Sequence, residues 1–272
     1  MPSMPSMPMT ELSIAVAQPR CVAYDVAANA SAHAEAIEAA RARVVVFPEL
    51  SLTGYELDAE TVAEDDARLA PIIAACGRTG TLALVGAPVP GPHIGILAVD
   101  GGGARVVYGK VHLHSTEAIR FRPGRHAVIE VDGWRLGLAV CRDTGVPEHA
   151  KTTAALRPRH NGGAGRGAAA PSPGDGGGGA PGIDGYVAGV VHADHEAGLH
   201  GERARRAAAD LGVWVATAAF AGPTGGGFDH TSGRSGIWSA DGELLAEASE
   251  SPDDFARAVF PAPQQNPRPT AP

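Results

Sequence analysis

Short apolar runs alternate with segments of helical periodicity along the first part of the chain, and this alternation constrains the fold more than any other feature. Residues 12–17 and 44–47 are β-like, and residues 26–43 between them place apolar side chains at helical spacing. A second helical pattern at residues 61–77 precedes another apolar run at residues 82–86. This order predicts βαβ units and therefore an α/β fold.

The pattern changes in the middle of the chain, where expected strands follow one another with Gly and Asp-Gly turns between them. These strands are residues 94–99, 105–108, 127–131 and 136–140. The last third returns to alternation, with expected helices at residues 148–156 and 201–211, strands at 186–191 and 213–218, and a hairpin at Asp241-Gly242. Helices that flank mixed sheets predict a layered sandwich.

The 272 residues are enough for one large domain, which we expect at residues 11–260. Residues 1–10 and 261–272 are expected to be disordered tails. Residues 157–182 consist mainly of Gly, Pro and Ala, so they bury too little apolar surface to offset the entropy of ordering. We expect a disordered surface insertion there, and its glycines form neither of the phosphate-binding motifs GxxxxGK(S/T) and GxGxxG.

Charge and composition favour small-molecule chemistry. The formal net charge is −8 and no long Lys/Arg cluster occurs, which argues against a nucleic-acid partner. No apolar run is long enough to span a membrane, and no secretory signal is evident, so a cytoplasmic location is expected. Cys21, Cys76 and Cys141 lie far apart in the sequence and predict three reduced thiols, without a metal pair or a disulfide framework.

Three reactive side chains follow expected strands directly. They are Glu49 in VVVFPELSLTGY, Lys110 in RVVYGKVHL and Cys141 in LGLAVCRDTGVPE. Ligands of layered α/β proteins tend to bind at the carboxyl ends of strands, so these three ends are candidates for one pocket. Taken singly, each residue is more often structural or solvated, because buried cysteines act as small apolar side chains and lysines commonly reach solvent.

The three segments together resemble the ordered signature of the carbon–nitrogen hydrolase (nitrilase-like) superfamily. The similarity rests on FPEL-x-LTGY, on YGKVHL followed by Glu117 and FRPG, and on G-x-x-x-CRD-x-x-x-PE, in this order. It extends from about residue 12 to residue 248, and only the 157–182 segment interrupts it. The resemblance implies a four-layer α-β-β-α sandwich.

The resemblance also implies roles for the matching residues. Glu49 would be the general base, Lys110 the electrostatic stabiliser and Cys141 the nucleophile, with Glu117 orienting Lys110. A neighbouring ammonium favours thiolate, a carboxylate accepts the proton of the thiol, and Lys110 with the backbone N–H of Arg142 would stabilise an oxyanion. No cofactor is expected for this chemistry.

Further residues near these motifs are expected to bind substrate or to support the site. Tyr55, Arg142 and His192 are the expected substrate contacts, although a solvent-facing or structural role fits Arg142 equally well. Asp143 and Glu148 are expected to be structural, fixing the turn at the cysteine and capping the next helix. Cys21 and Cys76 have no basic neighbours in the sequence and are expected to be inert.

The segment HADHEAGLH is rich in metal-binding residue types, but it does not predict a metal site. Its candidates are His192, Asp194, His195, Glu196 and His200, and no three of them match HExxH. A strand end that passes into a loop would point these side chains in different directions. We therefore expect no bound metal.

The predicted function is hydrolysis of a non-peptide carbon–nitrogen bond in a small amide or N-carbamoyl compound. The cysteine motif CRD resembles amidase-like branches rather than true nitrilases, in which CWE is usual. Two alternatives stay open: a glutaminase that supplies ammonia to a separate synthetase, and a non-catalytic binding protein on the same fold. The resemblance also implies a homodimer or a larger homo-oligomer.

Overall fold

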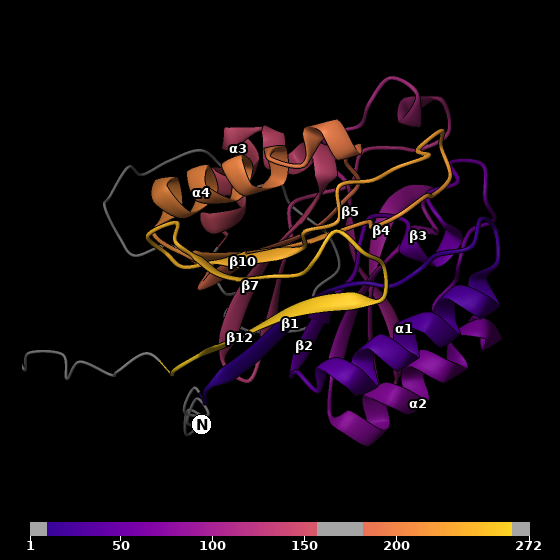
Figure 1. Ribbon diagram of the computed structural model, residues 1–272, viewed down its shortest axis with the longest axis horizontal. Helices are drawn as coiled ribbons and strands as arrows, with labels where there is room; N and C mark the ends of the chain where they lie inside the picture. Colours follow the sequence, from indigo (N-terminus) through magenta and orange to yellow (C-terminus); the bar gives the residue numbers. More distant parts are fainter. Residues whose placement is uncertain (1–9, 157–181, 263–272) are drawn as a thin grey trace, which may run out of the picture.

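The computed structural model describes residues 10–156 and 182–262, and the strands within them form two six-stranded sheets (Figure 1). The first sheet has the order β12-β1-β2-β3-β4-β5, with β1 (Leu12–Gln18), β2 (Val44–Val46), β3 (Leu82–Val89), β4 (His93–Asp100), β5 (Gly103–Gly109) and β12 (Asp254–Phe260). The second has the order β11-β10-β9-β8-β7-β6, with β6 (Val128–Val131), β7 (Trp134–Val140), β8 (Gly185–Val190), β9 (Trp214–Ala219), β10 (Gly236–Trp238) and β11 (Leu244–Glu247).

Helices cover the outer face of each sheet (Figure 1). Helices α1 (Val26–Ala40) and α2 (Ala70–Thr79) pack together on the first sheet, and α3 (Pro147–Ala154) and α4 (Leu199–Leu211) cover the second. The layers therefore follow the order α-β-β-α, and the expected sandwich is confirmed.

The side chains of β1 show how one strand serves two apolar cores. Ile14 and Val16 belong to the core between the sheets, whereas Ala15 and Ala17 belong to the core under α1 and α2. Successive side chains of a strand point to opposite faces. A strand buried on both faces therefore reads as a continuous apolar run rather than an alternating one.

Parallel pairing places several strand ends at one edge of each sheet. Strands β1, β2 and β3 are parallel, as are β7, β8 and β9, while the other neighbouring strands pair antiparallel. The strands β2 and β7, which precede Glu49 and Cys141, thus lie in different sheets. The site must form where the two sheets face each other.

Two expected helices are shorter than the periodicity predicts. Helix α1 ends at Ala40, and not at residue 43, because Arg41 adopts a left-handed conformation with φ of 45°. Helix α2 begins at Ala70 with a proline in its first turn, rather than at residue 61. The backbone N–H of Val62 donates instead to the carbonyl of Pro88, and Asp66 caps a short 3₁₀ turn.

Strand β12 was not among the expected elements, although it pairs with the whole of β1 from Leu12↔Phe260 to Gln18↔Asp254. Only Ala256 is fully buried among its residues, so the apolar signal of this edge strand is weak. Apart from the adjoining residues 10, 182, 261 and 262, the expected tails and the expected insertion lie outside the described residues.

The two chain segments that border residues 157–181 lie side by side. The N–H of Gly182 donates to the carbonyl of Ala154 at 2.8 Å, and Arg135 donates to the carbonyl of Leu156 at 3.0 Å. The N–H of Asp184 in turn donates to the carbonyl of Arg135 at 2.8 Å. Strand β7, which carries Arg135, thus holds both borders at one place.

His33 makes the fold sensitive to acid. Its ring lies on the buried face of α1, between the carbonyl of Asn29 at 2.6 Å and the hydroxyl of Ser51 at 2.8 Å. Burial lowers the pKa of His33 from 6.5 to about 4, and the hydrogen bond to Asn29 opposes this only in part. Unfolding therefore takes up a proton below pH 6.5, and stability is lost as the pH falls from 6.5 towards 4.

We expect His33→Asn, which cannot take up the proton, to reduce the difference in unfolding free energy between pH 7 and pH 5 by about 2 kcal/mol. Urea unfolding at the two pH values measures this difference. The matched control is His195→Asn, because the side chain of His195 is 80% exposed. An unchanged difference in the His33 variant would contradict the prediction.

Candidate active site

A buried lysine joins two carboxylates at the edge where the sheets face each other. Lys110 follows β5, and its Nζ donates to Glu49 Oε1 at 2.7 Å and to Glu117 Oε1 at 2.6 Å. All three side chains are buried, with at most 1% exposed. Glu117 begins a 3₁₀ turn (Glu117–Ile119), and its second oxygen accepts from the N–H of His114 at 2.8 Å. The structure thus brings three of the expected site residues into direct contact.

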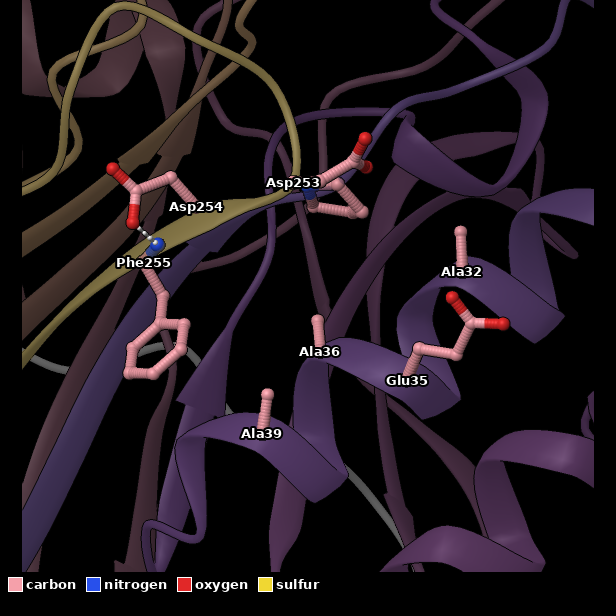
Figure 2. A pocket seen from close by; sticks show the side chains of 8 residues that line it. Ala32, Glu35, Ala36, Ala39, Asp253, Asp254 and Phe255 are labelled. Atoms are coloured by element: carbon pink, nitrogen blue, oxygen red, sulfur yellow. Dashed lines mark hydrogen bonds between the residues drawn. The ribbon is translucent and has the colours of Figure 1, made fainter.

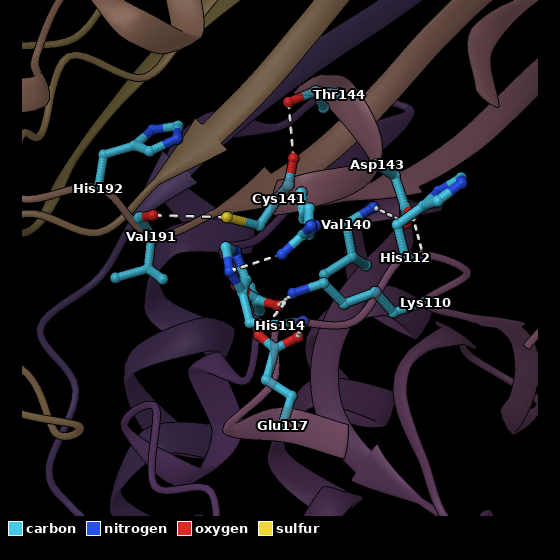
Figure 3. A network of polar contacts seen from close by, with 12 residues as sticks. Lys110, His112, His114, Glu117, Val140, Cys141, Asp143, Thr144, Val191 and His192 are labelled. Atoms are coloured by element: carbon cyan, nitrogen blue, oxygen red, sulfur yellow. Dashed lines mark hydrogen bonds and ion pairs between the residues drawn. The ribbon is translucent and has the colours of Figure 1, made fainter. Parts of the chain in front are cut away.

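Cys141 completes the site from the second sheet (Figure 3). It follows β7 and begins the 3₁₀ turn Cys141–Gly145 with φ of 41°, a conformation that is rare for a residue with a side chain. Its Sγ lies 3.5 Å from the carbonyl oxygen of Val191, at the end of β8. The hydroxyl of Thr144 donates to the carbonyl of Cys141 at 2.7 Å. The charges of Glu49 and Lys110 both shift the pKa of this thiol, which places it close to these two residues.

Asp143 holds this turn in place. Its Oδ2 accepts from the N–H of Val140 at 3.0 Å and from the hydroxyl of Tyr108 at 2.6 Å. Its Oδ1 accepts from the N–H of His112 at 2.8 Å. The hydroxyl of Tyr108 also lies 2.8 Å from Nε2 of His149 on α3. Asp143 therefore ties the turn to β5 and α3, in agreement with the structural role expected from the sequence.

Burial sets the protonation state of the thiol. It raises the pKa of Cys141 from 9.0 to about 12; Glu49 adds to the rise, and Lys110 opposes it. The ammonium was expected to favour thiolate, and it does act in that direction, but the loss of water around the sulfur outweighs it. The resting thiol is therefore neutral at pH 7, and a proton acceptor must act during any attack.

Glu49 has the properties of that acceptor. Burial raises its pKa from 4.5 to about 7, against the opposing charge of Lys110. Its Oε2 is buried and has no hydrogen-bond partner among the described residues. Burial lowers the pKa of Lys110, but the charges of Glu49, Cys141 and Glu117 outweigh it and hold the pKa above its usual value. The lysine thus stays an ammonium beside a carboxylate with one free oxygen.

The three expected substrate contacts have different surroundings. Tyr55 is buried, and its pKa is raised by burial and then by the charges of Glu49, Cys141 and Glu117, which places its hydroxyl beside the site. Arg142 is exposed, with Nη1 3.1 Å from Nδ1 of His114. Tyr55 is thus buried beside the reactive groups, whereas Arg142 is exposed.

His192 is engaged with helix α4. Its ring stacks on His200 with centroids 5.7 Å apart, and its Nε2 lies 3.3 Å from Nη1 of Arg203. Burial lowers its pKa to about 3, so it is neutral at pH 7. A contact between His192 and substrate stays a prediction.

The other cysteines and a separate pocket lie outside this site. Burial raises the pKa of Cys21 far above its usual value and that of Cys76 to about 11. A separate pocket of about 150 Å³ lies between α1 and the start of β12 (Figure 2). Its lining includes Glu35, Asp253, Asp254 and the α1 alanines Ala32, Ala36 and Ala39. Asp253 and Asp254 already accept hydrogen bonds from neighbouring backbone N–H groups.

Two further features of the described residues concern metal binding and membrane crossing. Within residues 10–156 and 182–262, no three His, Cys, Asp or Glu side chains are grouped so that they could hold a metal ion. In the same part of the chain, no helix is both long enough and apolar enough to cross a membrane.

Sequence reasoning missed the partners of Asp143. Tyr108 and His149 lie fully inside the molecule and support the turn at Cys141. Tyr108 stands two residues before Lys110, so its position in YGK was a usable signal. His149 lies on α3 and had no such signal, because nothing in the sequence joins α3 to β5.

The sequence is similar to known proteins over part of its length. The family model of carbon–nitrogen hydrolases matches residues 13–157. A Pseudomonas protegens protein described as a hydrolase in the pqqF 5′ region is 34% identical over an alignment of 144 positions, which covers 48% of this chain. The chain spans about half the length of this curated relative, 50% of which is covered.

Solved structures share the fold over nearly the whole chain. A CN-hydrolase superfamily protein of Xanthomonas campestris matches with a TM-score of 0.75 and 20% identity, covering 93% of this chain and 92% of that chain. A Saccharomyces cerevisiae member of branch 10 of the nitrilase superfamily matches with a TM-score of 0.73 and 20% identity, over 95% and 93%. An amidase from Nesterenkonia sp. matches with a TM-score of 0.71 and 23% identity, over 93% and 91%. The chain belongs to the carbon–nitrogen hydrolase family.

The contacts of Asp143 lead to a prediction about the turn. Asp143→Ala removes every acceptor of this carboxylate and leaves buried N–H and O–H groups unpaired, so we expect a stability loss of about 3 to 5 kcal/mol. The isosteric Asp143→Asn retains one acceptor oxygen and should lose less. Urea unfolding of both variants measures the two losses. Equal stability of Asp143→Ala and the wild type would contradict this role.

Proposed function

We propose that the protein hydrolyses a non-peptide carbon–nitrogen bond of a small amide or N-carbamoyl compound through a thioester on Cys141, without a cofactor. One observation carries the proposal: Glu49 keeps a buried carboxylate oxygen that has no hydrogen-bond partner in residues 10–156 and 182–262, while its other oxygen binds Lys110. A carboxylate held in this way can take a proton from a neighbouring thiol and return it later.

The first step joins the sulfur to the substrate. Sγ of Cys141 attacks the carbonyl carbon as the thiol proton passes to Oε2 of Glu49, which forms a tetrahedral oxyanion. The ammonium of Lys110 and the backbone N–H of Arg142 stabilise this oxyanion, and in well-studied enzymes one such donor contributes about 2.7 to 4 kcal/mol. Because the pKa of Glu49 is about 7, its carboxylate is abundant at neutral pH and its acid form is a competent donor.

The second and third steps release the products. The tetrahedral intermediate collapses, the carbon–nitrogen bond breaks, and Glu49 protonates the nitrogen, so that ammonia or an amine leaves. Water then attacks the thioester while Glu49 takes its proton, and the proton returns to sulfur when the carboxylic acid is released. Glu49 ends in its starting form, and no redox partner is needed.

One structural neighbour carries part of an amide compound on its active-site cysteine. A mutant of the Nesterenkonia amidase shows covalent addition of the acetamide moiety of fluoroacetamide at this cysteine. At 23% identity this likeness concerns the fold, so the substrate class here rests on Glu49, Lys110 and Cys141.

Replacing the nucleophile tests the thioester directly. Cys141→Ala should abolish ammonia release across a panel of amides, carbamoyl amino acids and nitriles, while far-UV circular dichroism stays native. Cys141→Ser should be nearly inactive, because a hydroxyl is much less acidic than a thiol. Mass spectrometry of quenched wild-type reactions should show an acyl adduct on Cys141. Cys76→Ala is the matched control and should keep turnover; a Cys141→Ala protein as active as wild type would refute the mechanism.

The pKa of Glu49 predicts the acid limb of the pH profile. Only the carboxylate accepts the thiol proton, so kcat/KM should fall about tenfold per unit below pH 7 and level off above it. Glu49→Gln should lose several orders of magnitude of activity, and its residual rate should lack this limb. The measurement is kcat/KM of both proteins from pH 5 to pH 9. A wild-type limb centred near pH 4.5 would show that burial does not set the pKa of the base.

A further inference from the structure

The backbone that carries Glu49 passes between two glycines, one from each sheet. Gly86 lies in β3 of the first sheet, and Gly189 lies in β8 of the second. Both face residues 47–50, the segment that follows β2.

Neither glycine has room for a side chain. A Cβ on Gly86 would lie 2.5 Å from the N of Leu50 and 3.0 Å from the C of Glu49, and closer still to the carbonyl oxygen of Pro48. A Cβ on Gly189 would lie 2.5 Å from the carbonyl oxygen of Phe47 and 2.9 Å from the N of Glu49. Nonbonded carbon contacts are normally about 3.5 to 4.0 Å, so residues 47–50 would have to move if either glycine carried a side chain.

Residues 47–50 also include an unfavourable backbone conformation. Leu50, directly after Glu49, has φ of 52° and ψ of 26°, in the left-handed region that residues with side chains rarely adopt. Such a conformation persists only where the surroundings over-determine it. Pro48, directly before Glu49, fixes its own φ. The backbone of Glu49 is therefore held from both faces and at both neighbours.

We infer that Gly86 and Gly189 are positioning residues for the general base. Because they lack side chains, the backbones of β3 and β8 can approach residues 47–50 and fix the backbone position of Glu49. From this position one carboxylate oxygen contacts Lys110, and the other is available to the thiol of Cys141. This inference rests on the proposed function, in which Glu49 accepts the thiol proton. Misplacement of a catalytic group by about 1 Å can reduce a rate by about 100-fold.

The kcat/KM for ammonia release tests the inference, with the amide of the panel above that the wild type hydrolyses fastest. It is measured at pH 8, where a pKa of about 7 leaves Glu49 mostly as the carboxylate. We expect Glu49→Gln to lower kcat/KM at least tenfold, and Gly189→Ala and Gly86→Ala each to do the same. In the Glu49→Gln background, Gly189→Ala should add less than twofold, because groups that act together are not additive.

Gly185→Ala is the matched control. Gly185 lies four residues earlier in the same strand, and its Cβ would lie 2.5 Å from Cη2 of Trp214 and closer still to two other ring atoms. The crowding is comparable, but Glu49 is not involved. This variant should therefore lose thermal stability and keep the wild-type kcat/KM.

The outcomes separate the inference from the proposed function. If Glu49→Gln keeps the wild-type kcat/KM, the base assignment fails and the inference with it. If Glu49→Gln is slow but folded Gly189→Ala and Gly86→Ala stay within twofold of wild type, only the inference fails. If neither glycine variant folds, Pro48→Ala decides: a loss below threefold supports the glycines as the constraint, and a tenfold loss assigns the constraint to Pro48 and overturns the inference.

Discussion

The ammonium of Lys110, buried between Glu49 and Glu117, is the interaction on which the site depends. A charge taken out of water costs several kcal/mol unless close partners replace its hydration. Here two carboxylates within 2.7 Å replace it, and one of them is held in turn by the N–H of His114. Burial raises the pKa of the Cys141 thiol and keeps it protonated; the charge of Glu49 adds to this effect, and that of Lys110 opposes it.

The two sheets supply different parts of the site. The first sheet supplies the charged residues Glu49 and Lys110, and the second supplies Cys141 on a strained turn that Asp143 secures. A thiol of raised pKa is a weak nucleophile at rest, so reactivity depends on the timing of proton transfer to Glu49 rather than on a standing thiolate. Geometry between the sheets therefore matters more here than the acidity of the sulfur.

The sequence predicted the layers and the residues that meet, because strand ends and short motifs are local signals. The contact between Lys110 and Glu117 was implied by the family resemblance, and the structure places Nζ of Lys110 2.6 Å from Oε1 of Glu117. The limits of α2 and the existence of β12 were missed because tertiary contacts decide them, such as the bond from Val62 to Pro88. The pKa of Cys141 likewise depends on burial, which no spacing in the sequence reports.

Ala154 and Gly182 are hydrogen-bonded to each other, so the geometry of the site does not depend on how many residues lie between them. Both borders are fixed on β7 through Arg135, so β8 starts from the same point whatever residues 157–181 contain. Doubling a flexible closed loop costs only about 0.6 kcal/mol. Evolution, or an experimenter who inserts a reporter domain, can thus add sequence at this junction while the distance from Cys141 to Val191 stays as it is.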